Sequence, residues 1–402
     1  MEQAISQRAQ ALPASAIRKY VPLSDALKKT GVSVFHLNIG QPDVATSHLF
    51  FDAIRAFHEP VVAYENSAGN PLLKKAISNY YAKLGLEVTP EQCIVTSGGS
   101  EALIMAISLV CDPGDQIIIP EPYYTNYNTF AMQNQVEVVP FRTRLEDNFA
   151  IHDIQNLEAL VTPKTKAILI CSPNNPTGAV MSAEELEQVC AIARKHNLFV
   201  ISDEVYREFA YEGLQSTSLL SKPEMKDLAI VADSVSKRYS ICGARVGWIA
   251  SRNPEVMAAA LKFAQARLCV ATLEQVAAAE IIDKGHDDIE RAKLEYDARR
   301  QLAHKMLTQA GLKCGYPQGA LYLMVDLGVD AEEFTRFMLT DYSGIEKDKE
   351  TAMVTPAANF YKTPGQGLTQ ARIAFVLETP KLEKAIRHLL EGLDEFKKYA
   401  KK

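Results

Sequence analysis

The chain has 402 residues, of which 47% are hydrophobic and 23% charged, and its formal net charge at pH 7 is -6. This length exceeds what one hydrophobic core usually organises, and the composition is that of an ordinary globular protein, which excludes a disordered or fibrous chain. The acidic balance, without a Lys- and Arg-rich block before the last few residues, argues against nucleic acid as a partner.

The cysteines and histidines give no support for disulfides or a metal site. The seven cysteines are odd in number and widely spaced, so we expect reduced thiols, and the eight histidines include no HExxH pair. The N-terminus lacks the basic start and apolar core of a signal peptide, and the longest apolar run, Ala102–Cys111, is too short to span a bilayer. We therefore expect a soluble, cytoplasmic protein without metal or membrane contacts.

From about residue 90, short β-branched runs alternate with helical stretches, which predicts the strands and crossover helices of a parallel α/β sheet. The strands are apolar throughout, as strands covered on both faces should be. They are expected at residues 93–96, 116–120, 136–141, 166–171, 198–203, 229–234 and 246–251. Ser182 and Glu185 have the spacing of a capping box, and Asp112-Pro113-Gly114 ends a helix that begins near Ser100.

After about residue 285 the pattern changes to a long charged helix, from Asp287 to about Ala310, followed by candidate strands within 319–327, 352–361 and 371–378. We interpret this region as a smaller α+β domain. The segment before about residue 45 has a helix start at Pro22 and a stop at Gly31, and it is too short to fold alone. The predicted division is a large domain over residues 46–285 and a small domain built from residues 1–45 and 286–402.

The stretch from Asp233 to Trp248, DSVSKRYSICGARVGW, has a lysine at a strand end, with hydroxyl residues before it and glycines after it. Imine chemistry needs such an amine, partly desolvated and open to a flat cofactor. A lone lysine is usually a solvated surface cation, so Lys237 by itself carries little weight. Position for position, however, the stretch resembles the lysine signature of class I and II aminotransferases, which belong to fold type I of the pyridoxal-phosphate-dependent transferases.

The resemblance implies that Lys237 is the catalytic amine and binds pyridoxal 5'-phosphate as a Schiff base, while Ser234 and Arg245 hold the cofactor phosphate. Such donors suit a phosphate dianion. It also implies an α/β fold with a seven-stranded, mostly parallel sheet in a large domain, plus a smaller α+β domain. The resemblance extends from Gly40 to Arg372, in the family's order.

Two loops that directly follow apolar strands carry the next motifs. In SDEVY the resemblance assigns Asp203 to the pyridine nitrogen of the cofactor and Tyr206 to its ring hydroxyl, roles that a carboxylate and a phenol can fill. In SPNNPTG it places Asn175 between the cofactor and the substrate carboxylate. Without the resemblance, SPNNPTG would be interpreted as an ordinary turn, and Asp203 could equally be a cap of the turn that follows it.

The stretch TSGGSEAL is a glycine turn from a strand into a helix, whose amides can cradle a phosphate. The resemblance makes Gly99 and Ser100 the donors. No GxGxxG or Walker sequence occurs in the chain, which removes the main support for nicotinamide or ATP. Tyr124 takes the place of the aromatic that stacks on the pyridine ring, although Thr125 stands where a proline often follows; an aromatic packed at a strand end is the alternative.

Three further residues are assigned through the resemblance. Tyr64, in YENSAG, corresponds to a tyrosine that reaches the phosphate of the neighbouring subunit, which implies a homodimer with shared active sites. Gly40, in NIGQPD, matches a glycine whose backbone faces the substrate. Arg372, in QARIAF, falls at the carboxylate-binding arginine; an exposed strand arginine is the alternative, but a planar bidentate donor suits an α-carboxylate.

Together these motifs predict an aminotransferase that moves the amino group of an L-amino acid to a 2-oxo acid. Aspartate with 2-oxoglutarate is the leading pair. Alanine and aromatic amino acids stay as alternatives, because the stretch around Arg267 does not match the motif with which some relatives bind the second carboxylate of a dicarboxylic substrate. A carbon-sulfur β-lyase or a ring-forming synthase could use the same scaffold. A transcription regulator would need a DNA-binding module, for which the residues before Gly40 offer no room, and a non-catalytic binding protein would be expected to lack Lys237.

Overall fold

The computed structural model describes residues 5–399, in which one sheet has seven strands in the order β2-β8-β7-β6-β5-β3-β4. β8 is the one strand of this sheet that runs opposite to the other six, so the predicted mostly parallel sheet is confirmed. All seven predicted strands are present. They are β2 (Cys93–Thr96), β3 (Gln116–Glu121), β4 (Glu137–Arg142), β5 (Thr165–Cys171), β6 (Phe199–Asp203), β7 (Ala229–Ser234) and β8 (Gly247–Ala250).

Helices cover both faces of this sheet, which is why its strands are apolar throughout. One apolar core lies between the sheet and α4 (Pro71–Lys83), α8 (Ala183–His196) and α11 (Thr272–Lys284). A second core on the opposite face includes α5 (Gly98–Val110), α6 (Asn126–Gln133) and α10 (Pro254–Arg267). The remaining helices around the sheet are α3 (His48–Arg55), α7 (Ile154–Ala159) and the short α9 (Val235–Arg238).

The local signals for helix ends are confirmed for two of these helices. Ser182 accepts from the backbone of Glu185, whose side chain accepts from the backbone of Ser182, so α8 begins with the predicted capping box. Helix α5 ends at Val110, as predicted, but begins at Gly98 rather than near Ser100. The earlier start depends on the positive φ of 76° at Gly98, a conformation that glycine adopts without strain.

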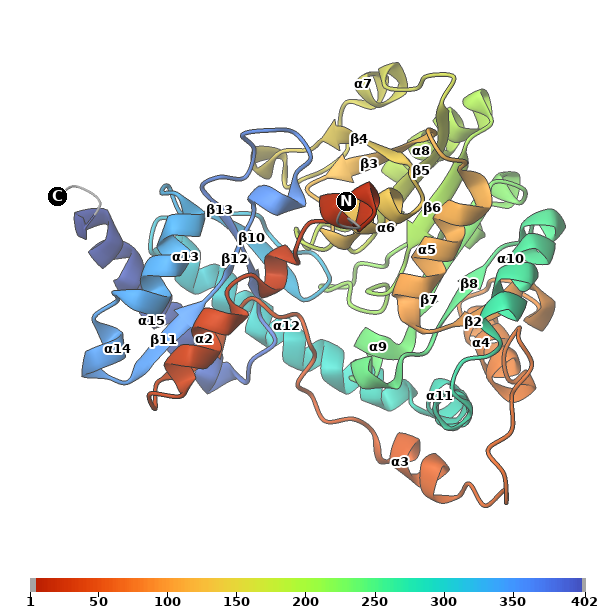
Figure 1. The fold of residues 1–402 in the computed structure, drawn as a ribbon, viewed down its shortest axis with the longest axis horizontal. Coiled ribbons are helices and arrows are strands. Elements are labelled where there is room, and N and C mark those ends of the chain that lie inside the picture. The colour runs from red at the N-terminus through yellow and green to blue at the C-terminus, as the bar shows by residue number, and fades with distance from the viewer. Residues whose placement is uncertain (1–4, 400–402) are drawn as a thin grey trace.

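The two ends of the chain meet in a second group of elements. A four-stranded antiparallel sheet has the order β12-β13-β10-β9, and β1 pairs in parallel with β11 in a two-stranded sheet. Figure 1 shows the C-terminal elements of this group in blue beside the larger sheet, with the long helix α12 extending from one toward the other. The strands are β1 (Ser33–His36), β9 (Lys313–Cys314), β10 (Tyr322–Asp326), β11 (Glu350–Met353), β12 (Thr355–Pro356) and β13 (Gln370–Ala374).

A third apolar core joins these strands to the helices around them. The helices of this region are α1 (Gln7–Ala11), α2 (Val21–Lys28), α12 (His286–Gln309), α13 (Ala331–Thr340), α14 (Gly344–Lys347) and α15 (Thr379–Tyr399). The pairing of β1 with β11 brings the N-terminal segment against the C-terminal one. The domain limits at residues 45 and 285 stay a prediction, and residues 1–4 and 400–402 of the predicted small domain lie outside the described part.

Three further observations apply to residues 5–399. No helix there has both the length and the hydropathy needed to cross a bilayer. All seven cysteines have free thiols. Groups of three or more His, Cys, Asp or Glu side chains placed to hold a metal ion are absent from the same residues.

Candidate active site

A cavity of about 570 Å³ lies at the carboxyl ends of the parallel strands, where an α/β sheet places its ligands. The loops after β2, β5, β6 and β7 all open into it, and residues from both chain ends complete its wall. Every predicted site residue except Tyr64 lines this cavity. These residues are Gly40, Gly99, Ser100, Tyr124, Asn175, Asp203, Tyr206, Ser234, Lys237, Arg245 and Arg372.

Lys237 lies on the one-turn helix α9, directly after β7, and its side chain is half-buried in the cavity. Its Nζ donates to the carbonyl oxygen of Gly40 at 2.8 Å and lies 5.8 Å from the ring centroid of Tyr206. A Cβ at position 40 would lie 1.8 Å from the hydroxyl oxygen of Tyr322, so this close approach requires glycine. Gly40 and Tyr322 therefore set the position of the lysine amine.

Asp203 is the last residue of β6 and is buried. Its Oδ2 accepts from the hydroxyl of Tyr127 at 2.6 Å, and its Oδ1 accepts from the backbone N–H of Val205 at 3.3 Å. Burial raises the pKa of Asp203 to about 6, although the two hydrogen bonds lower it. The carboxylate is therefore charged at neutral pH and faces the cavity as its single acidic lining residue.

Tyrosines line the cavity near Lys237. The hydroxyls of Tyr206 and Tyr322 lie 2.7 Å apart, and their rings meet edge to face. Tyr124 meets Tyr127 edge to face, with ring centroids 5.6 Å apart, and its hydroxyl accepts from Asn126 Nδ2 at 2.9 Å. Burial raises the pKa of the Tyr206 hydroxyl, so this group stays protonated at neutral pH.

The turn before α5 faces Arg245 at another end of the cavity. The N-cap residue Ser97 makes no side-chain capping bond, so the first amides of this helix remain available to an anion. A Cβ at Gly98 would lie 2.3 Å from Nη2 of Arg245, so the turn needs its glycine. The hydroxyl of Ser234 donates to Val246 at 2.8 Å, which competes with its predicted donation to a phosphate.

Arg372, on β13, is buried with an exposed fraction of only 1%. Its Nη1 donates to Asn175 Oδ1 at 2.9 Å and its Nη2 to the carbonyl of Asn38 at 2.5 Å, but its buried Nε has no partner among the described residues. The guanidinium lies 4.4 Å from the ring centroid of Tyr322. Burial lowers the pKa of Arg372, because no carboxylate of the described chain compensates the loss of water. This arginine is arranged to receive an anion.

The sequence interpretation missed three residues that organise the site: Tyr127, Tyr322 and Asn38. Tyr127 lies three residues after Tyr124 in the chain, and this helical spacing was the available signal. Tyr322 and Asn38 are linked to the site by contacts between residues far apart in the chain, for which no local pattern exists.

Two residues that the sequence analysis considered lie outside the cavity of their own chain. Tyr64 is 82% exposed, so its predicted role toward a neighbouring subunit stays a prediction. Arg267 donates from Nε to Glu101 at 2.9 Å and from Nη2 to the carbonyl of Val95 at 2.9 Å. Its guanidinium is thus engaged away from the cavity.

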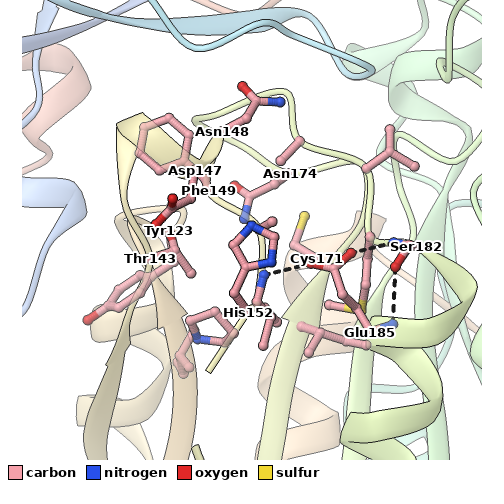
Figure 2. A pocket seen from close by; sticks show the side chains of 18 of the residues that line it. Tyr123, Thr143, Asp147, Asn148, Phe149, His152, Cys171, Asn174, Ser182 and Glu185 are labelled. Atoms are coloured by element: carbon pink, nitrogen blue, oxygen red, sulfur yellow. Dashed lines mark hydrogen bonds between the residues drawn. The ribbon is translucent and has the colours of Figure 1, made fainter. Parts of the chain in front are cut away.

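A second cavity of about 280 Å³ shares Tyr127 with the first. Figure 2 shows His152 in this second cavity, between the side of Tyr123 and the side of Cys171. Its wall contains no lysine or arginine and is largely apolar. It therefore lacks both an amine for imine chemistry and a cation for a phosphate.

Comparisons with known proteins agree with this arrangement. Residues 32–389 match the family model described as aminotransferase class I and II. The chain is 34% identical to the putative aminotransferase YugH of Bacillus subtilis, over 93% of this chain and 95% of the relative. It is 30% identical to aromatic-amino-acid aminotransferase 2 of Thermococcus litoralis, over 98% of this chain and 99% of the relative.

A solved structure gives the same result for the fold. A double mutant of Thermus thermophilus aspartate aminotransferase superposes with a TM-score of 0.88 at 29% identity, covering 97% of this chain and all of that one. The chain therefore belongs to the class I and II aminotransferases, a family of enzymes with the type I fold.

Proposed function

We propose that this protein is a pyridoxal 5'-phosphate-dependent aminotransferase in which Lys237 binds the cofactor covalently. The observation that carries the proposal is the buried guanidinium of Arg372, which has no carboxylate partner among the described residues and lines the same cavity as Lys237 and Asp203. A buried cation of this kind is costly unless a ligand supplies the anion, and an α-carboxylate fits its planar donor group.

The residues of the cavity fit pyridoxal phosphate. Arg245 and the amides of Gly99 and Ser100 supply donors for a phosphate, as exposed helix amides commonly do. The Asp203 carboxylate can pair with a pyridinium nitrogen, and the hydroxyl of Tyr206 can reach the ring oxygen. When bound, the cofactor supplies the electron sink that amino-group transfer needs.

The protein's own groups divide the remaining work. With the cofactor bound, the Lys237 amine, which donates to the carbonyl of Gly40, would serve as the group that moves a proton at the reacting carbon of the amino acid. Asp203 would pair with the protonated pyridine nitrogen of the cofactor, and the hydrogen bond from Tyr127 favours the charged form of this carboxylate. Ser234 would add a donor for the phosphate only if its hydroxyl turned from Val246.

The substrate is anchored by Arg372 together with Asn175, whose side chains are hydrogen-bonded to each other. Both can bind an α-carboxylate, so many α-amino acids are admissible. We propose aspartate with 2-oxoglutarate as the leading pair, supported by the similarity to an aspartate aminotransferase structure. The aromatic-amino-acid relative keeps aromatic substrates as an alternative, with alanine behind them.

We also propose a cytoplasmic homodimer with shared active sites. Exposed apolar side chains gather in the segment around Tyr64 and beside it, as expected of a surface that another subunit covers. Val61 and Val62 are 68% and 60% exposed, and Thr272 donates to the nearby carbonyl of Ala63 at 2.9 Å. Sedimentation of the purified protein tests this, and a fully active monomer would contradict it.

The experiment that tests the activity measures turnover with an amino acid in the presence and absence of a 2-oxo acid. Transamination requires the acceptor for continued turnover, because the amino group must be passed on. A carbon-sulfur β-lyase would turn over a suitable substrate without any acceptor. Acceptor-independent turnover, and no acceptor-dependent turnover with any amino acid, would contradict the proposal.

A further inference from the structure

Four cationic side chains line the active-site cavity, and three of them have a place in the proposed function. Lys237 provides the amine, Arg245 faces the phosphate end and Arg372 faces the α-carboxylate. The fourth is Arg18, an exposed arginine whose side chain makes no hydrogen bond or ion pair with any residue from 5 to 399. The single acidic residue of the wall, Asp203, is engaged by Tyr127. Arg18 is therefore the cavity's uncommitted cation.

A chain of hydrogen bonds holds the backbone at Arg18 beside the α-carboxylate anchor. The one-turn helix Ala16–Arg18 contacts β12, and the carbonyl of Ile17 accepts from Asn38 Nδ2 at 3.1 Å. The carbonyl of the same Asn38 accepts from Nη2 of Arg372 at 2.5 Å. Asn38 thus links the backbone next to Arg18 to the guanidinium of Arg372, and both arginines line the cavity.

The neighbouring cation shows that this placement is specific to position 18. Lys19 lies outside the cavity wall and pairs with Glu332 at 2.8 Å. Of these two adjacent cations, only Arg18 lines the cavity, and only Lys19 has an ion-pair partner among the described residues. Arg267, the other candidate from the sequence, is engaged by Glu101 in its own chain.

We propose that Arg18 binds the side-chain carboxylate of a dicarboxylic substrate and so selects aspartate, glutamate and their 2-oxo acids. The inference rests on the proposed function, because it assumes that Arg372 holds the α-carboxylate. A dicarboxylic substrate carries two carboxylates, and the cavity offers one arginine for each. A guanidinium binds a carboxylate through two parallel hydrogen bonds, so it distinguishes this side chain from a methyl group or an aromatic ring.

The test compares Arg18→Gln and Arg18→Lys with wild type in single-turnover reactions of the purified holoenzyme. For aspartate, glutamate, alanine and phenylalanine, we compare the single-turnover rate constant of the half-reaction divided by the dissociation constant of the amino acid. A hydrogen bond to a charged group changes binding by about 10- to 100-fold, so Arg18→Gln should lose this factor for aspartate and glutamate relative to alanine. Arg18→Lys should retain part of it, since the charge remains but the second hydrogen bond is lost.

Lys19→Gln is the matched control, because it removes a neighbouring charge outside the cavity and should leave the ratio of aspartate to alanine unchanged. Equal changes for acidic and neutral substrates in Arg18→Gln would overturn the inference. So would a wild type that uses alanine or phenylalanine but not aspartate, although the aminotransferase proposal would then stand. Failure with all amino acids would instead refute the proposed function.

Discussion

The hydrogen bond from Tyr127 to Asp203 makes a quantitative prediction. The Tyr127→Phe substitution removes the hydroxyl 2.6 Å from Oδ2 and leaves that oxygen of a buried carboxylate without this donor. A hydrogen bond to a charged group contributes about 1.5–3 kcal/mol, which corresponds to about one to two pH units. Because the bond favours the charged form, its loss should raise the pKa of Asp203 further above its present value of about 6.

The proposed role of Asp203 needs the charged carboxylate, so activity should fall as the pH falls through its pKa. The acid limb of the pH profile for the half-reaction with a single amino acid should therefore move to higher pH in Tyr127→Phe. The control is Tyr123→Phe, since the hydroxyl of Tyr123 donates to Asn128 at 2.8 Å and does not contact the carboxylate. An unmoved acid limb in Tyr127→Phe, or an equal movement in the control, would refute the reasoning.

Three further substitutions follow from the same geometry. Gly40→Ala should lower the unfolding free energy by about 1–3 kcal/mol and reduce turnover, because its Cβ would meet Tyr322. Tyr322→Ala removes a buried ring and is itself destabilising, but in that background the further loss from Gly40→Ala should be smaller, and an equal loss in both backgrounds would contradict the steric cause. Arg372→Lys should raise KM about 10- to 100-fold for acidic and neutral amino acids alike, and a substrate-selective effect in steady-state assays would count against an α-carboxylate anchor. Burial raises the pKa of Glu204 to about 8, so the stability that this group contributes is full below the unfolded pKa near 4.5 and is lost as the pH rises through about 8. In denaturant unfolding, the stability of Glu204→Gln relative to wild type should therefore increase over that pH range, and a pH-independent difference would exclude this titration.

The sheet could be predicted from the sequence because each of its strands is a separate apolar run. Both faces are covered by helices, so burial is complete along β2, β7 and β8, whereas the edge strand β4 is exposed at both of its ends. The motif residues Asp203 and Lys237 were found for a related reason. Asp203 is the last residue of β6 and Lys237 lies on the short helix that follows β7, and the carboxyl ends of parallel strands converge at one edge of the sheet.

Contacts between distant residues could not be predicted in this way. Tyr322 and Gly40 are separated by most of the chain, and only the folded structure shows that the tyrosine ring occupies the space beside the glycine. The same holds for Asn38, whose carbonyl accepts from Arg372. The hydroxyl of Ser234 is a further case, because its residue type suits a phosphate whereas its hydrogen bond is made to Val246.

The most direct test of the central claim identifies the residue that holds the cofactor. Sodium borohydride reduction of the purified holoenzyme, followed by proteolysis and mass spectrometry, should find the pyridoxyl group on the peptide that contains Lys237. The variant Lys237→Ala should yield no such peptide, should retain cofactor without a covalent bond and should lose nearly all turnover. An adduct on a different lysine of the wild type, or full turnover in Lys237→Ala, would contradict the account.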